Sequence, residues 1–278
     1  MKDDGWDKAI KHCKYVMHIA SPFPMKVSND REKLLPVAVD GTLRVLNSSI
    51  KNNVEQIIVT SSIVAMFRKP NRSNPYTFGE NDWTDENWIE GVSDYFLSKT
   101  RAERNAWEFM ESKGLKNKLT TINPGGVFGD ALDKKGGTSI EYVRQFLKGK
   151  FPAAPKFAVL ISDVKDVAKS HVACIRNKKV GGRRLIVGKE VKKLVELSQI
   201  MAEAMPEYAK KVPKKELPNF MVKLISYIDS SAKTMIPDLG IMMQTDSTYA
   251  EDLLGLKFKG AKDCISENAK SVVKLGLV

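Results

Sequence analysis

The sequence predicts an α/β fold in which the ends of parallel strands carry the functional residues. A buried strand over 57–59 leads directly into three hydroxyl residues at 60–62. A second strand over 119–123 opens into a loop over 124–129 that contains one proline and three glycines. Residues 95–113, between the two strands, contain good helix formers and neither glycine nor proline. Because ligands of α/β sheets bind at the carboxyl ends of the strands, we expect the hydroxyls and the loop to meet there.

The other elements are predicted from local patterns. Residues 16–20 predict an apolar strand, and the apolar spacing over 31–52 predicts one long helix. Residues 67–90 are polar, and we expect a loop folded over the surface beside the predicted site. Gly114 is a fitting C-cap for the helix that starts at Tyr95. Farther along, the patterns predict a flexible loop at 136–137, a helix at 139–148, a connector at 151–155, a strand at 183–188, a helix at 191–205, a linker at 213–218, a helix from 220, and closing helices over 246–256 and 261–275.

The candidate chemistry begins with Tyr95 and Lys99. Residues four apart lie on the same face of a helix, so the phenol and the ammonium are expected side by side. A free tyrosine has a pKa of about 10, and a neighbouring cation favours the phenolate and lowers that pKa toward the range of a general acid or base. The pair alone is common on surface helices. Its position between the Ser61–Ser62 strand end and the 124–129 loop favours a catalytic site.

Several segments resemble the extended short-chain dehydrogenase/reductases, in the dihydroflavonol-4-reductase-like and methylglyoxal-reductase-like branch. The resemblance implies a Rossmann-like, doubly wound parallel sheet that lacks its first βα units, with a smaller C-terminal substrate domain. It places a partial dinucleotide-binding domain at 1–125, with 166–188 returning to it, and a mainly substrate-binding domain at 126–278. The segments that carry the resemblance are 16–24, 41–46, 59–62, 80–84, 95–107, 122–129 and 157–172.

The resemblance also implies roles for individual residues. Ser62 would stabilise the carbonyl oxygen of a small-molecule substrate, Tyr95 would donate the proton, and Lys99 would lower the phenol pKa and bind the nicotinamide ribose. The implied activity is reduction of a ketone or aldehyde with NADP as cofactor, NAD being the alternative. The residues expected to contact the cofactor are Ala20, Ser21, Thr60, Ser61, Tyr95, Lys99, Pro124, Gly125 and Val127.

One feature of the family is missing from the sequence. No G-x-x-G-x-x-G turn, whose backbone would approach the cofactor pyrophosphate, occurs in the 278 residues. We therefore expect an N-terminally truncated member that binds NADPH weakly or not at all, with an apolar edge near residues 16–20. An unpaired edge of this kind favours aggregation or a homodimer through strand pairing.

Composition limits the classes of protein to which the chain can belong. The contents of 42% hydrophobic and 28% charged residues are those of an ordinary globular protein, and no apolar run approaches the length of a membrane span. The three cysteines are scattered, which favours a reducing compartment, with cytoplasm as the expected location. The net charge of +12 comes from dispersed lysines and arginines without a nucleic-acid-binding motif, so we expect no nucleic-acid partner.

Several residues that could suggest other sites are interpreted as structural. His18 and His171 are expected to be packed, and Asp163 and Asp166 to cap a helix rather than bind a metal. A set of apolar residues could line a substrate pocket but is more readily explained as core: Phe220, Tyr227, Met235, Met242 and Met243.

Two alternatives to carbonyl reduction stay open. The missing glycine-rich turn is also compatible with a catalytically silent homologue that acts as a binding or regulatory protein. The same three site residues would serve a hydroxysteroid-type dehydrogenase that runs in the oxidative direction.

Overall fold

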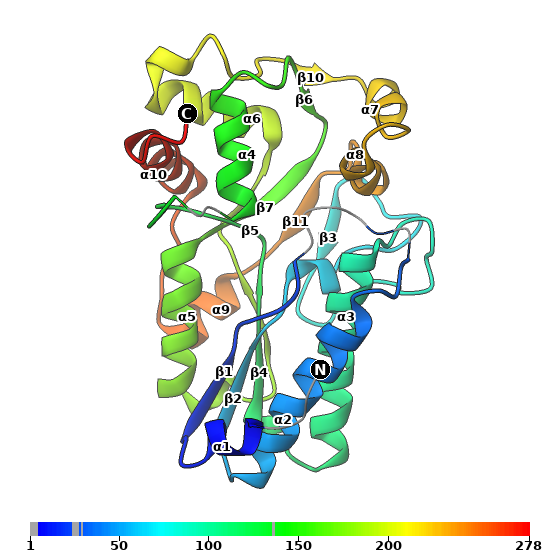
Figure 1. The fold of residues 1–278 in the computed structure, drawn as a ribbon, viewed down its shortest axis with the longest axis vertical. Helices are drawn as coiled ribbons and strands as arrows, with labels where there is room; N and C mark the ends of the chain where they lie inside the picture. Colours follow the sequence, from blue (N-terminus) through cyan, green and yellow to red (C-terminus); the bar gives the residue numbers. More distant parts are fainter. Residues whose placement is uncertain (1–4, 24–27, 29, 135–136) are drawn as a thin grey trace.

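The computed structural model describes residues 5–23, 28, 30–134 and 137–278. Its centre is a sheet of four parallel strands in the order β1-β2-β4-β8 (Figure 1). The strands are β1 (Tyr15–His18), β2 (Gln56–Thr60), β4 (Leu119–Pro124) and β8 (Arg184–Val187). The parallel sheet of the predicted Rossmann-like fold is confirmed.

Helices cover both faces of this sheet. Ile57 and Val59 pack with residues of α2 (Gly41–Lys51) and α3 (Asp94–Ser112). Ile58, between them in β2, packs instead with residues of α5 (Val164–Arg176) and α9 (Thr248–Leu254). Successive side chains of a strand point to opposite faces, so the apolar run of β2 is buried on both sides. Figure 1 shows the two pairs of helices on opposite sides of the sheet.

A second layer lies above the carboxyl ends of these strands (Figure 1). Its sheet has the order β5-β7-β9, with β5 parallel and β9 antiparallel to β7. Helices pack on it in a separate apolar core. The elements of this layer are β5 (Gly126–Phe128), β7 (Ala158–Asp163), β9 (Glu190–Lys193), α4 (Thr138–Leu147), α6 (Leu194–Ala204) and α10 (Ala261–Lys274).

Short elements complete the chain. β6 (Ala154–Pro155) pairs with β10 (Glu216–Leu217), and β3 (Tyr76–Phe78) pairs with β11 (Met243–Thr245). The remaining helices are α1 (Trp6–Ile10), α7 (Asn219–Ile225), α8 (Ser230–Met235), a π-helix η1 (Pro36–Asp40) and the 3₁₀ turns η2 (Ile63–Ala65), η3 (Lys116–Lys118), η4 (Lys178–Val180), η5 (Pro206–Tyr208) and η6 (Ile236–Asp238). Across the described ranges, every helix is too short or too polar to cross a membrane.

Two predicted helices begin too early. Residues 31–34 are turns, and regular helix starts around Pro36, which has no N–H and is tolerated only in the first turn. Residues 191–193, predicted as the start of a helix, belong to strand β9 because β7 offers them backbone partners. The predicted C-cap at Gly114 is confirmed, since its φ of +68° is the left-handed conformation that ends a helix.

Two expectations about burial are wrong. The 67–90 segment does not simply lie over the surface, because Phe67 and Phe78 are buried in a core cluster beside α3. Phe220 and Tyr227 belong neither to a core nor to the pocket described below, since their side chains are 64% and 87% exposed. The flexible loop expected at 136–137 includes residue 136, which lies outside the described residues.

The division into domains stays a prediction, as does self-association. β8 does pair with β4 in the central sheet, as expected for the 166–188 segment. Among the described residues β1 pairs with β2 alone, and its four residues are half-buried.

Candidate functional site

The end of β2 presents three hydroxyl residues with different partners. Thr60 Oγ1 lies 2.7 Å from His171 Nε2. His171 Nδ1 lies 2.8 Å from the carbonyl oxygen of Val167, which can only accept, so Nδ1 carries the proton and Nε2 accepts from Thr60. Ser61 donates to Glu103 at 2.5 Å, whereas Ser62 Oγ makes longer contacts: it donates to the Pro124 carbonyl at 3.5 Å and accepts from the Val64 N–H at 3.3 Å. Of the two serines, Ser62 therefore keeps the hydroxyl that a ligand can use.

Helix α3 brings Tyr95 and Lys99 to the same place. Lys99 is 7% exposed and donates through Nζ to the Thr60 carbonyl at 3.3 Å. Burial lowers the Lys99 pKa to about 8, and the nearby Glu103 carboxylate opposes that fall. Burial raises the pKa of Tyr95 to about 12, and a hydrogen bond with Ser62 offsets part of the rise. The expected lowering of the phenol pKa by Lys99 is not found, and Tyr95 is held as a neutral proton donor.

The loop after β4 forms the floor of the site. The Gly125 N–H donates to Ser162 Oγ at 2.8 Å, which fixes the loop against β7. A Cβ atom at Gly125 would lie 2.2 Å from the carbonyl oxygen of Leu160, so only glycine fits this close approach.

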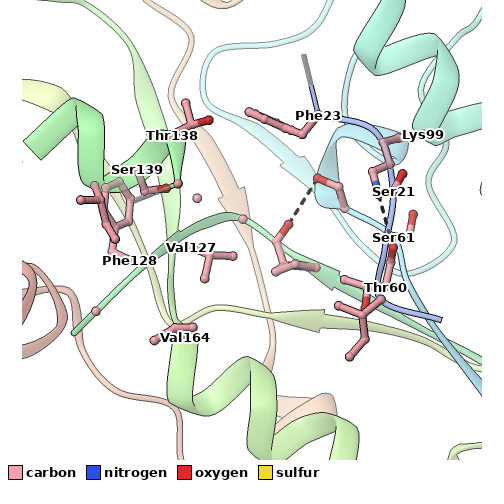
Figure 2. Close-up of a pocket in the computed structure, with 18 of the residues that line it drawn as sticks. Ser21, Phe23, Thr60, Ser61, Lys99, Val127, Phe128, Thr138, Ser139 and Val164 are labelled. Atoms are coloured by element: carbon pink, nitrogen blue, oxygen red, sulfur yellow. Dashed lines mark hydrogen bonds between the residues drawn. The ribbon is translucent and has the colours of Figure 1, made fainter. Parts of the chain in front are cut away.

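These elements enclose a pocket of about 490 Å³, a size within the range of small-molecule sites. Ser62, Tyr95 and Lys99 all line it. In Figure 2, Lys99 lies on one side of the pocket, and Val127 on the other. The cofactor residues expected from the sequence that line the pocket are Ser21, Thr60, Ser61, Tyr95, Lys99, Pro124, Gly125 and Val127, whereas Ala20 does not line it.

Several residues of the site were not predicted from the sequence. Phe23 packs edge-on against Tyr95, with the ring centroids 4.7 Å apart. Thr138 and Ser139, at the start of α4, line the pocket opposite Lys99 (Figure 2), and Asn268 of α10 also lines it. None of these belongs to a motif that links it to Tyr95 in the sequence. Glu103 was also missed, although it follows Lys99 by one helical turn.

The residues interpreted as structural have local partners. His18 lies 3.4 Å from Thr42 Oγ1, and burial, followed by the charge of Lys99, lowers its pKa. Asp163 caps α5 by accepting from the Lys165 N–H at 2.8 Å, as expected. Over the part of the chain that the structure describes, no group of three or more His, Cys, Asp or Glu residues could hold a metal ion.

Comparison with known proteins identifies the family. The sequence model of the 3-beta hydroxysteroid dehydrogenase/isomerase family matches residues 1–183. The chain belongs to this family. The NADPH-dependent methylglyoxal reductase GRE2 of Saccharomyces cerevisiae is 31% identical over 291 residues, covering 98% of this chain and 80% of the relative. Cinnamoyl-CoA reductase 1 of Petunia hybrida is 28% identical, and the match covers 97% of this chain and 73% of the relative.

A solved structure supports the same assignment. The yeast methylglyoxal/isovaleraldehyde reductase Gre2 complexed with NADPH superposes with a TM-score of 0.78 at 28% identity, covering 99% of this chain and 81% of that one. The predicted family, the oxidoreductase class and NADP as the cofactor of the relatives are thereby confirmed. The roles of the individual site residues stay predictions.

Proposed function

We propose that the chain reduces an aldehyde or ketone, with NADPH as the hydride donor, at a site formed by Ser62, Tyr95 and Lys99. The observation that carries the proposal is that these three side chains line one pocket, in which burial keeps the Tyr95 phenol protonated. A reductase needs a proton donor next to the carbonyl oxygen, and a neutral phenol can serve as one.

Each residue has a distinct task in this mechanism. Bound NADPH supplies the hydride to the carbonyl carbon. Ser62 donates a hydrogen bond to the carbonyl oxygen and stabilises the negative charge that develops there. Tyr95 transfers its phenol proton to that oxygen. When the cofactor is bound, Lys99 would hold a ribose hydroxyl of its nicotinamide half.

The donor groups around the pocket fit the nicotinamide half of the cofactor. The Lys99 ammonium and the hydroxyl of Ser21 line the same wall, and both can bond to ribose and amide oxygens. We assign no residue of this chain to the cofactor pyrophosphate, because the sequence has no G-x-x-G-x-x-G turn to hold it. We therefore assign only the nicotinamide half to residues of this chain.

The test measures NADPH oxidation with methylglyoxal and with an aromatic aldehyde. Tyr95→Phe is expected to lose about 10²–10⁴ in rate, since it removes the proton donor. Tyr142→Phe is the matched control, because Tyr142 is also a buried phenol with a raised pKa and does not line the pocket. Turnover of Tyr95→Phe within a few-fold of the parent would contradict the assignment.

A second candidate follows from the name of the matching family. A 3β-hydroxysteroid dehydrogenase would use the same three residues in reverse, with Tyr95 as the base. NADP⁺-dependent oxidation of a 3β-hydroxysteroid, without reduction of either aldehyde, would favour this reaction. A chain that binds neither cofactor nor substrate would instead support the silent homologue.

A further inference from the structure

Glu103 is a buried carboxylate with an unusually complete set of partners. It lies on α3 one turn after Lys99, and only 1% of its surface is exposed. Five side chains donate hydrogen bonds to its two oxygens. They are Ser61 at 2.5 Å, Arg184 at 2.7 Å, Asn123 at 2.8 Å, Thr121 at 3.0 Å and Trp107 at 3.3 Å.

These contacts connect the helix to three strands of the central sheet. Ser61 follows β2, Asn123 belongs to β4, and Arg184 belongs to β8. Asn123 also donates to the backbone carbonyl of Ser62 at 3.2 Å. Glu103 therefore holds the Ser61 hydroxyl directly and the Ser62 backbone through one amide. A shift of this carboxylate would move the serine pair relative to Tyr95.

The same carboxylate is the anion that acts on Lys99. Burial disfavours a cation, and Glu103 opposes that effect. Two other titratable groups lie around Lys99. One is His18 of β1, whose pKa the Lys99 charge lowers, and the other is Tyr95 on the same helix face. Arg184 of β8 pairs with Glu103 at 2.7 Å.

Burial would by itself raise the Glu103 pKa. Arg184, together with hydrogen bonds from Ser61 and Asn123, outweighs burial and lowers it, so the group is an anion.

We propose that Glu103 is a positioning residue of this site, whose carboxylate fixes the Ser61–Ser62 strand end against α3 and keeps the Lys99 side chain positively charged. The inference rests on the proposed function only for its kinetic consequence. The effect on Lys99 is a property of the folded chain and can be measured without turnover.

The first measurement is the titration of Lys99 by competitive acetic anhydride labelling, which modifies only the neutral amine and is read by peptide mass spectrometry. In Glu103→Gln the titration is expected to move to lower pH by about one unit or more, since an opposite charge nearby is removed. Glu251→Gln is the matched control. Glu251 is 2% exposed, but it accepts from Lys189 at 2.7 Å and from the Phe258 N–H rather than from the serine pair.

A second variant removes the risk of misfolding. Glu103→Gln leaves the Arg184 guanidinium buried without its anion, which is destabilising. The double variant Glu103→Gln/Arg184→Met removes both charges and is compared with Arg184→Met alone. The Lys99 titration is again expected at lower pH in the variant that lacks the carboxylate. A Lys99 titration that stays at the parent pH in both comparisons would overturn the proposal.

The kinetic measurement separates positioning from stability. In Glu103→Gln the alkaline limb of the kcat/KM profile is expected to move to lower pH together with the Lys99 titration, whereas partial unfolding would reduce the rate equally at every pH. An unshifted profile in an active, folded variant would contradict the role. A parent chain without carbonyl reduction would refute the proposed function, and labelling would still decide the role of Glu103.

Discussion

Replacing Asp238 by alanine is expected to destabilise the fold by about 3–5 kcal/mol, the cost of breaking a buried ion pair from one side. Asp238 lies in η6 and is 1% exposed. Its Oδ2 accepts from Arg68, and its Oδ1 forms an ion pair with Arg72 Nη2 at 2.7 Å; both arginine side chains are nearly inaccessible. Arg68 also lies 3.6 Å from the ring centre of Phe96, next to Tyr95.

The loss follows from what remains in the variant. Arg68 keeps hydrogen bonds to the carbonyls of Gly91 and Thr234, both at 2.8 Å, but no carboxylate then balances the two guanidiniums. Unpaired charges in the interior are costly because they lose hydration without gaining an opposite charge.

Equilibrium unfolding in urea, followed by circular dichroism, measures the effect. With an m-value of about 3 kcal/mol/M for a chain of this size, the midpoint should fall by about 1–1.7 M. Glu111→Ala is the control, because Glu111 pairs with Lys116 at 2.9 Å on the exposed surface, where a salt bridge is worth at most about 1 kcal/mol. A midpoint loss for Asp238→Ala no larger than that of the control would refute the reasoning.

Three further changes test other parts of the structure. Gly125→Ala should destabilise the chain by a few kcal/mol and reduce activity, because its Cβ would meet the Leu160 carbonyl at 2.2 Å; a parent-like melting temperature would contradict this. Asp163→Ala should cost more than the about 1 kcal/mol of a lost helix cap in urea unfolding, because it removes the α5 cap and also the buried carboxylate that pairs with Lys259 at 3.1 Å; an unchanged midpoint would contradict both roles. Because the folded pKa of Glu103 is lowered, its ionised form stabilises the fold above the unfolded pKa, and that stability is lost as pH falls through the folded pKa. Glu103→Gln should therefore show a flatter loss of stability toward acid pH than the parent, and an equally steep loss in both would contradict it.

The central sheet could be predicted because its strands β2, β4 and β8 are almost entirely buried. Residues 57–59 form an apolar run that needs no knowledge of the partner strand, since helices cover both of its faces. Strand β9 could not be predicted in this way. Its sequence, Glu-Val-Lys-Lys, has no strong strand preference, and it becomes a strand because β7 pairs with it.

The candidate site could likewise be predicted only where local signals mark its residues. Ser62, Tyr95 and Lys99 could be placed together because strand ends and helix periodicity are local signals. The role of Glu103 depends on Arg184, eighty-one positions later in the chain, and no local pattern links the two. The raised pKa of Tyr95 was missed for a similar reason, because the burial that causes it is a property of the folded pocket.

The indole of Trp107 gives this site an optical probe of its own. Its Nε1–H donates to Glu103, and a second tryptophan, Trp83, stacks on Arg184 with the guanidinium 3.7 Å from the ring centre. Two of the four tryptophans thus contact the same ion pair. Replacing Trp6 and Trp88 by phenylalanine would leave an intrinsic fluorescence signal that comes from these two rings alone. Changes at the serine pair could then be followed by emission, without an attached dye and without turnover.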